Sequence, residues 1–282
     1  NLIILKMKKI FLYISLILFF SVINFIYYVP SGEFSLIEFF YYSNSLIIFI
    51  LATILTSLLL KEKWYLSGVN LDLYSLRDFC IGSLLGIVSI VIITLFSCLL
   101  GAHIYYNESI LTKDFFSDLL SILNNVGVEE LIFRGVIFQV LFYKWHKVGA
   151  TIISSLLFLI AHIFTGSTSF LLMLNTFIAG LLFCFMYIQT KSLWLPFSFH
   201  SFWNIGMFLV FEHTAEKTIY SNSIFNLVFE QNNQLASIFI GSTYGFENGL
   251  LCTLILCTCF YITTKLKPSY RINAAIYKQE FN

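Results

Sequence analysis

Long apolar stretches recur along the chain, and short segments that carry most of the charged residues separate them. A membrane-spanning helix needs about 20 consecutive, predominantly apolar residues. Eight segments approach or meet this length: 10–29, 40–60, 79–100, 116–143, 149–165, 168–189, 192–211 and 248–264. The pattern therefore predicts an all-α fold, a polytopic membrane helical bundle of about eight transmembrane helices.

Composition supports a membrane protein and gives no sign of a nucleic-acid partner. Hydrophobic residues make up 59% of the chain and charged residues 11%, whereas a typical soluble domain has about 25% charged residues. The formal net charge of +1 does not indicate nucleic-acid binding. The six cysteines lie in apolar segments without metal-type pairing, so we interpret them as buried thiols.

The basic residues predict how the helices are oriented. With the amino terminus inside, the outer segments carry only Lys113 and Lys217, and Arg134 lies within a predicted helix. All other lysines and arginines fall in inner segments, so the positive-inside rule places both termini in the cytoplasm. The abundance of Phe, Ile, Asn and Lys is typical of a low-GC bacterium. We therefore expect a multi-pass plasma-membrane protein, in a bacterial cytoplasmic membrane.

Two adjacent carboxylates, Glu129 and Glu130, lie inside one of the apolar segments. A carboxylate at membrane depth costs several kcal/mol unless it is paired or hydrated. On a helix, Glu130 and Arg134 are four residues apart and share a face, so they can form an ion pair. Such a pair could serve helix packing alone. Glu129 points about 100° away from that face and lacks this partner, which favours a functional role.

Two later apolar segments each contain one histidine. His162 follows Phe158 by one helical turn, and Asn204 follows His200 by one turn, so each pair shares a helix face. A lone intramembrane histidine is often a hydrogen-bonded packing residue, and a His–Asn pair can be an interhelical polar clamp. The three polar segments together are much more specific than any one of them.

This set of side chains suits the attack of water on a carbonyl group. A carboxylate can deprotonate the water, a histidine or a metal can hold it, and His or Asn donors can stabilise the oxyanion. The chain shows no Ser–His–Asp order and no local zinc-binding spacing. Any metal would therefore be bound by residues from three different helices.

The three segments resemble the CPBP family of intramembrane proteases, also called the Abi or CAAX protease and bacteriocin-processing family. Its signatures are Glu-Glu-x-x-x-Arg, Phe-x-x-x-His and His-x-x-x-Asn on successive membrane helices. They match Glu129 to Arg134, Phe158 to His162 and His200 to Asn204, in that order. The resemblance covers about residues 115–215. It divides the chain into N-terminal membrane helices (1–114), a catalytic membrane domain (115–215), and an external loop, last span and cytoplasmic tail (216–282).

The resemblance implies an intramembrane endopeptidase related to the enzyme that removes the last three residues of prenylated CAAX proteins. It implies that Glu129 is the general base and that His162 positions the water. His200 and Asn204 then form the oxyanion side, and Glu130 and Arg134 are a supporting pair. The residues permit two forms of the centre. One holds a divalent metal such as zinc through Glu129, His162 and His200, and the other is a metal-free, glutamate-activated water.

The function predicted first is hydrolysis of a peptide bond in a membrane-associated substrate: a prenylated CAAX-like protein, a bacteriocin or a pheromone. The implied partners are this peptide or protein and the lipid bilayer, and the sequence leaves the oligomeric state open. The alternative is a non-catalytic immunity or scaffold protein that binds a peptide or partner with the same polar cluster. A proton-coupled transporter is a third reading, but such proteins usually contain repeats or broken helices, and neither is evident here.

Overall fold

The computed structural model describes residues 68–69, 71–107, 112–144, 146–163, 169–214, 223–229, 233–241 and 245–267. The predicted helices 10–29 and 40–60 lie outside these residues, as does the predicted cytoplasmic tail after residue 267. Every other predicted span corresponds to helix, which agrees with the all-α class.

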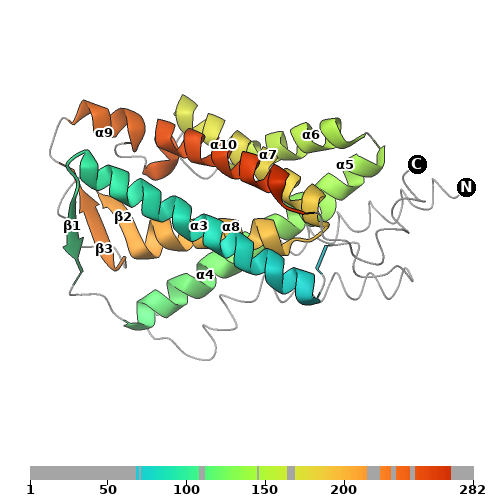
Figure 1. Ribbon diagram of the computed structural model, residues 1–282, viewed down its shortest axis with the longest axis horizontal. Coiled ribbons are helices and arrows are strands. Elements are labelled where there is room, and N and C mark those ends of the chain that lie inside the picture. The colour runs from blue at the N-terminus through green and yellow to red at the C-terminus, as the bar shows by residue number, and fades with distance from the viewer. Residues whose placement is uncertain are drawn as a thin grey trace, which may run out of the picture.

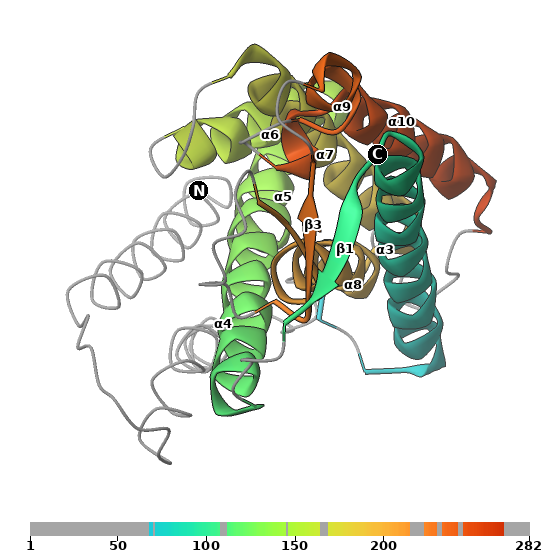
Figure 2. The same ribbon diagram turned by 90° about the vertical axis from the view of Figure 1, so that its left-hand side faces the viewer.

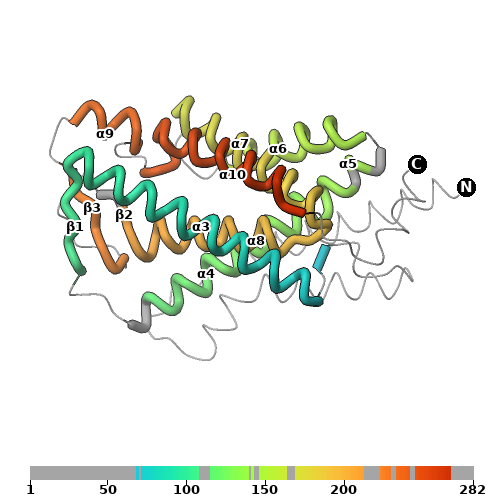
Figure 3. The backbone as a smooth tube through the Cα atoms, viewed as in Figure 1, coloured from blue at the N-terminus to red at the C-terminus, as the bar shows by residue number. Residues whose placement is uncertain are grey.

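Helices run along the long axis of the molecule in two layers (Figures 1 and 3). One layer contains α3 (Leu73–Leu99), α8 (Trp194–Asn204) and α4 (Thr112–Glu130). The other contains α6 (Lys147–Ile163), α7 (Phe170–Thr190) and α10 (Leu250–Lys265). Helix α4 continues through η2 (Leu131–Phe138) into α5 (Gln139–Lys144), which lies beside α6 of the other layer (Figure 1). Three short helices complete the set: η3 (Ile205–Val210), α9 (Gln234–Phe239) and η5 (Phe246–Asn248).

Two of the described helices, α3 and α7, are long and apolar enough to cross a membrane, and α6 and α10 are apolar but shorter. The total of eight transmembrane helices therefore stays a prediction. The fourth and seventh predicted spans are each divided, because the chain changes from an α-helix to a π-helix at Leu131 and again at Ile205.

The outer face of α3 is apolar and its inner face is small and polar. Exposed residues on this helix include Leu76, Leu84, Val88, Val91 and Leu95. Its buried residues include Ser75, Gly82, Gly86, Ser89, Thr94 and Ser97. A soluble helix has the opposite distribution, whereas membrane helices face lipid with large apolar side chains and contact other helices through small ones. This face therefore supports the membrane prediction.

Glycines on α3 allow α8 to pack directly against it. A Cβ atom on Gly82 would lie 2.1 Å from Ser198 Oγ and 2.4 Å from the Leu195 carbonyl oxygen. One on Gly86 would lie 2.8 Å from the Phe199 carbonyl oxygen. Only glycine fits such a close approach between two helix backbones. The contact fixes α8, which carries His200, between α3 and α4 (Figure 2).

A small sheet at one end of the bundle was not predicted (Figure 2). It contains β1 (His103–Tyr106), β2 (Phe211–Thr214) and β3 (Phe225–Val228), in the order β1-β3-β2. Strand β3 pairs antiparallel with β1 and parallel with β2. Each strand has only four residues, too few for alternation to distinguish a strand from the end of an apolar helix.

The prediction that all six cysteines are buried thiols is correct for only some of them. Cys184, Cys252 and Cys259 are buried free thiols, whereas Cys80 and Cys257 are exposed. The two exposed thiols lie on α3 and α10, where the apolar outer surface of the helices explains why they occur in apolar segments.

Candidate active site

Glu130 and Arg134 form the ion pair predicted from their spacing. Arg134 Nη1 donates to Glu130 Oε1 at 3.0 Å, and the two side chains are 0% and 1% exposed. The guanidinium carbon also lies 4.3 Å from the ring centre of Phe158 and 4.8 Å from that of Phe183. Aromatic faces attract a cation, so the rings and the carboxylate together compensate for burying the charge.

The same oxygen of Glu130 also accepts a hydrogen bond from a histidine on another helix. His200 Nδ1 lies 3.0 Å from Glu130 Oε1, and the imidazole stacks on the Phe183 ring at 4.9 Å. A carboxylate paired with arginine accepts hydrogen bonds, so the His200 proton sits on Nδ1. The other ring nitrogen, Nε2, therefore lies on the side of the imidazole that faces Glu129. Helical spacing predicted the pair of Glu130 with Arg134, but it did not predict the hydrogen bond between Glu130 and His200 on α8.

His162 is fixed in the same tautomer by its own helix. Its Nδ1 lies 2.9 Å from the carbonyl oxygen of Phe158, and a carbonyl oxygen can only accept. The imidazole also lies 4.3 Å from the Phe158 ring. The Phe-x-x-x-His motif thus has a local physical meaning, because its first residue supplies both a ring contact and a hydrogen-bond acceptor.

Glu129 lies between the two histidines. Its Oε2 is 4.0 Å from His162 Nε2 and 3.9 Å from His200 Nε2. The side chain is 34% exposed, yet Oε2 itself is buried and has no hydrogen-bond partner among the described residues. Two imidazole nitrogens thus converge on one carboxylate oxygen. This carboxylate is the one that the sequence distinguished from the ion-paired Glu130.

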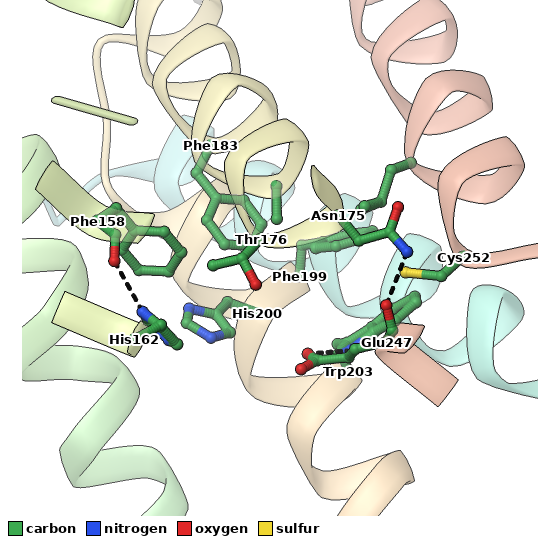
Figure 4. Close-up of a pocket in the computed structure, with 12 residues that line it drawn as sticks. Phe158, His162, Asn175, Thr176, Phe183, Phe199, His200, Trp203, Glu247 and Cys252 are labelled. Atoms are coloured by element: carbon green, nitrogen blue, oxygen red, sulfur yellow. Dashed lines mark hydrogen bonds between the residues drawn. The ribbon is translucent and has the colours of Figure 1, made fainter. Parts of the chain in front are cut away.

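A cavity of about 40 Å³ begins at the two imidazoles (Figure 4). This volume is large enough to hold water. Its walls are mainly aromatic and aliphatic, and its polar side chains are His162, His200, Asn175, Thr176 and Glu247. Asn204, predicted as an oxyanion donor, ends α8 one turn after His200 but is not among the residues that line this cavity. The other predicted site residues are close to one another in the structure: Glu129, Glu130, Arg134, His162 and His200.

Glu247 is the residue of this site that sequence reasoning missed. It was placed in an external loop, but η5 brings it to the cavity wall, where Trp203 Nε1 donates to its Oε1 at 3.2 Å. The contact joins residues 44 positions apart, so helical spacing could not reveal it. The available signal was an acidic residue immediately before an apolar segment.

The three candidate metal ligands do not form a metal site as they lie. Around a tetrahedral zinc ion, with bonds of about 2.0–2.1 Å, ligand atoms are roughly 3.3 Å apart. Glu129 Oε2 lies 3.9 and 4.0 Å from the two imidazole nitrogens. Within the described residues, no three His, Cys, Asp or Glu side chains are grouped closely enough to hold a metal ion.

One family comparison gave a match. The sequence model of the family described as type II CAAX prenyl endopeptidase Rce1-like matches residues 112–206, about a third of the chain. This range contains all three motifs, from the start of α4 to the beginning of η3. Neither a curated protein nor a solved structure matches the chain. The match confirms the predicted resemblance: residues 112–206 are similar to the Rce1-like family, a family of membrane-embedded proteases.

Proposed function

We propose that the chain is an intramembrane endopeptidase in which Glu129 activates a water molecule for attack on a peptide bond. The observation that carries this proposal is the position of Glu129 Oε2, buried without a partner among the described residues and flanked by two imidazole Nε2 atoms. A water oxygen about 2.8 Å from each of two acceptors can span a gap of this size. The water would donate one hydrogen bond to Glu129 and the other to His162.

Hydrolysis follows from this arrangement in two steps. Glu129 takes a proton from the water as the hydroxide oxygen bonds to the substrate carbonyl carbon. His200, in its protonated form, donates from Nε2 to the oxyanion, and Asn204 would donate from the end of α8. Glu129 then gives its proton to the amide nitrogen, and the carbon–nitrogen bond breaks. The products are a carboxylic acid, which keeps the second proton of the water, and an amine; transfer of that proton to the amine gives carboxylate and ammonium.

Glu130 and Arg134 support the histidine rather than contact substrate. Glu130 accepts from His200 Nδ1–H and so holds that imidazole in place, while Arg134 neutralises Glu130 in the buried interior. His200 therefore presents Nε2 to the site in a fixed orientation. This network would also suit a packing role, which is the observation that keeps the non-catalytic scaffold as the second candidate.

The proposed substrate is a membrane-associated protein with a prenylated CAAX-type terminus, because the matched family is described by that activity. The match lends no support to bacteriocin processing or to an immunity role. The zinc-bound form of the centre is not part of the proposal, since the donor atoms are spaced too widely.

The test is cleavage of a farnesylated, internally quenched CAAX peptide by the full chain in detergent. Glu129→Gln keeps the size of the side chain but removes the base, so kcat should fall by at least about 100-fold. Glu212→Gln, a matched change on strand β2 in the end sheet, should leave the rate unchanged. Cleavage by Glu129→Gln at the wild-type rate would refute the mechanism and favour the scaffold.

A further inference from the structure

The cavity beside the two histidines has an acidic group that the proposed water activation does not use. Glu247 Oε1 accepts from Trp203 Nε1 at 3.2 Å, and Trp203 itself stacks on Phe199. One hydrogen bond leaves most of the acceptor capacity of the carboxyl group free. Figure 4 shows the Glu247 carboxyl group on the cavity wall, directed toward His200 and His162.

The backbone around Glu247 is held by a dedicated set of contacts. Asn175 is buried on α7, and its Nδ2 donates to the carbonyl oxygens of Glu247 at 2.7 Å and Gly249 at 3.1 Å. The side-chain oxygen Oδ1 of Asn175 accepts from Thr253 Oγ1 at 2.6 Å, and Ser169 Oγ donates to Asn248 Oδ1. These contacts connect η5 and the start of α10 to α7, so Glu247 cannot leave the cavity without breaking several buried hydrogen bonds.

The two histidines are shared by the proposed water site and by the cavity that Glu247 lines. Their Nε2 atoms face Glu129, and their rings also line the cavity that contains Glu247. A peptide bond attacked beside Glu129 and bound along this cavity therefore has a hydrogen-bond acceptor available at the cavity wall. Among the groups of a scissile peptide bond, only the nitrogen bears a hydrogen that an acceptor can bind.

We propose that Glu247 is a further catalytic residue, which accepts a hydrogen bond from the scissile N–H and holds the leaving amine. The inference rests on the proposed function. Glu247 exchanges no proton: the amine receives its proton from Glu129, and the Glu247 oxygen strengthens its hydrogen bond as positive charge develops on that nitrogen. Trp203 is a positioning residue, since its N–H fixes the orientation of the carboxyl group.

An ester analogue of the substrate separates this role from a structural one. In the farnesylated CAAX peptide, the scissile amide is replaced by an ester, which has no N–H but still requires an activated water. Glu247→Gln places an amide donor where a carboxylate oxygen stood, so it should lower kcat/KM for the amide about 100-fold. The same variant should cleave the ester within about 3-fold of the wild-type rate.

Two further variants complete the experiment. Trp203→Phe keeps the stacked ring but loses the N–H, so it should show a smaller loss with the same preference for the ester. Glu129→Gln should lose cleavage of both the amide and the ester. Equal loss of amide and ester cleavage in Glu247→Gln, or no loss of either, would overturn the role of Glu247. Undiminished cleavage of both by Glu129→Gln would instead overturn the proposed water activation, as would a wild-type chain that cleaves neither.

Discussion

Arg134 offers a quantitative test of the buried network, through the substitution Arg134→Met. The side chain is fully buried and pairs with Glu130, which is also buried. Removing one partner of a buried ion pair costs about 3–5 kcal/mol, because the other charge is left uncompensated. The guanidinium also faces the rings of Phe158 and Phe183, contacts worth about 0.5–2 kcal/mol each. Since neighbouring terms do not add, we expect a loss of about 3–5 kcal/mol in the free energy of unfolding.

A double substitution identifies the uncompensated charge as the cause. Glu130→Gln removes the negative charge but retains an oxygen that can accept from His200 Nδ1. The double variant Glu130→Gln with Arg134→Met should therefore be more stable than Arg134→Met alone by at least about 1 kcal/mol. This recovery would not occur if Arg134 acted only by filling volume.

The measurement is unfolding of the full chain by SDS in mixed micelles, followed by tryptophan fluorescence. Lys265→Met is the control, because Lys265 is exposed at the end of α10 and should change stability by less than about 1 kcal/mol. A loss below about 1 kcal/mol in Arg134→Met would refute the reasoning. So would a double variant no more stable than the single one.

Two remaining predictions test packing and metal dependence. Gly82→Val should destabilise the chain by about 2 kcal/mol or more, because even a Cβ atom would meet Ser198 and Leu195 of α8. The control is Ser83→Val, at the neighbouring position on α3, which should cause a much smaller loss of stability in the same SDS titration. Dialysis against EDTA and 1,10-phenanthroline should leave peptide cleavage unchanged, and activity that is lost on chelation and restored by zinc would contradict the metal-free mechanism.

Local spacing predicted the parts of the site that lie within one helix. The helical period placed Glu130 beside Arg134, and separated Glu129 from both. The same rule placed Phe158 beside His162, where the carbonyl oxygen and the ring both contact the imidazole. These predictions succeeded because residues four apart on a helix are neighbours whatever the tertiary fold.

Contacts between helices could not be predicted in this way. The bond between Glu130 and His200 joins residues 70 positions apart, and the Asn175 contact with Glu247 joins residues 72 apart. Both depend on how α7 and α8 cross their neighbours, which the close approach at Gly82 and Gly86 partly sets. No single-helix period carries that information, so the sequence yielded Glu129, Glu130, His162 and His200 as a list of polar positions without Glu247.

Two π-helices adjoin the polar positions of the candidate site. π-Helices account for well under 1% of residues in proteins and occur frequently at functional sites. Here one begins directly after Glu130, and the other directly after Asn204.

A π-turn contains an extra residue, so the helix face beyond it is rotated relative to the face before it. In η2 the following residues Phe133 and Val136 are buried in the core, while Glu129 before it still faces the two histidines. A regular α-helix over the same stretch would contain one residue fewer, and the residues after it would be rotated by about 100° relative to Glu129. The irregular backbone therefore allows one helix to supply both an apolar packing surface and the carboxylate that we propose as the base.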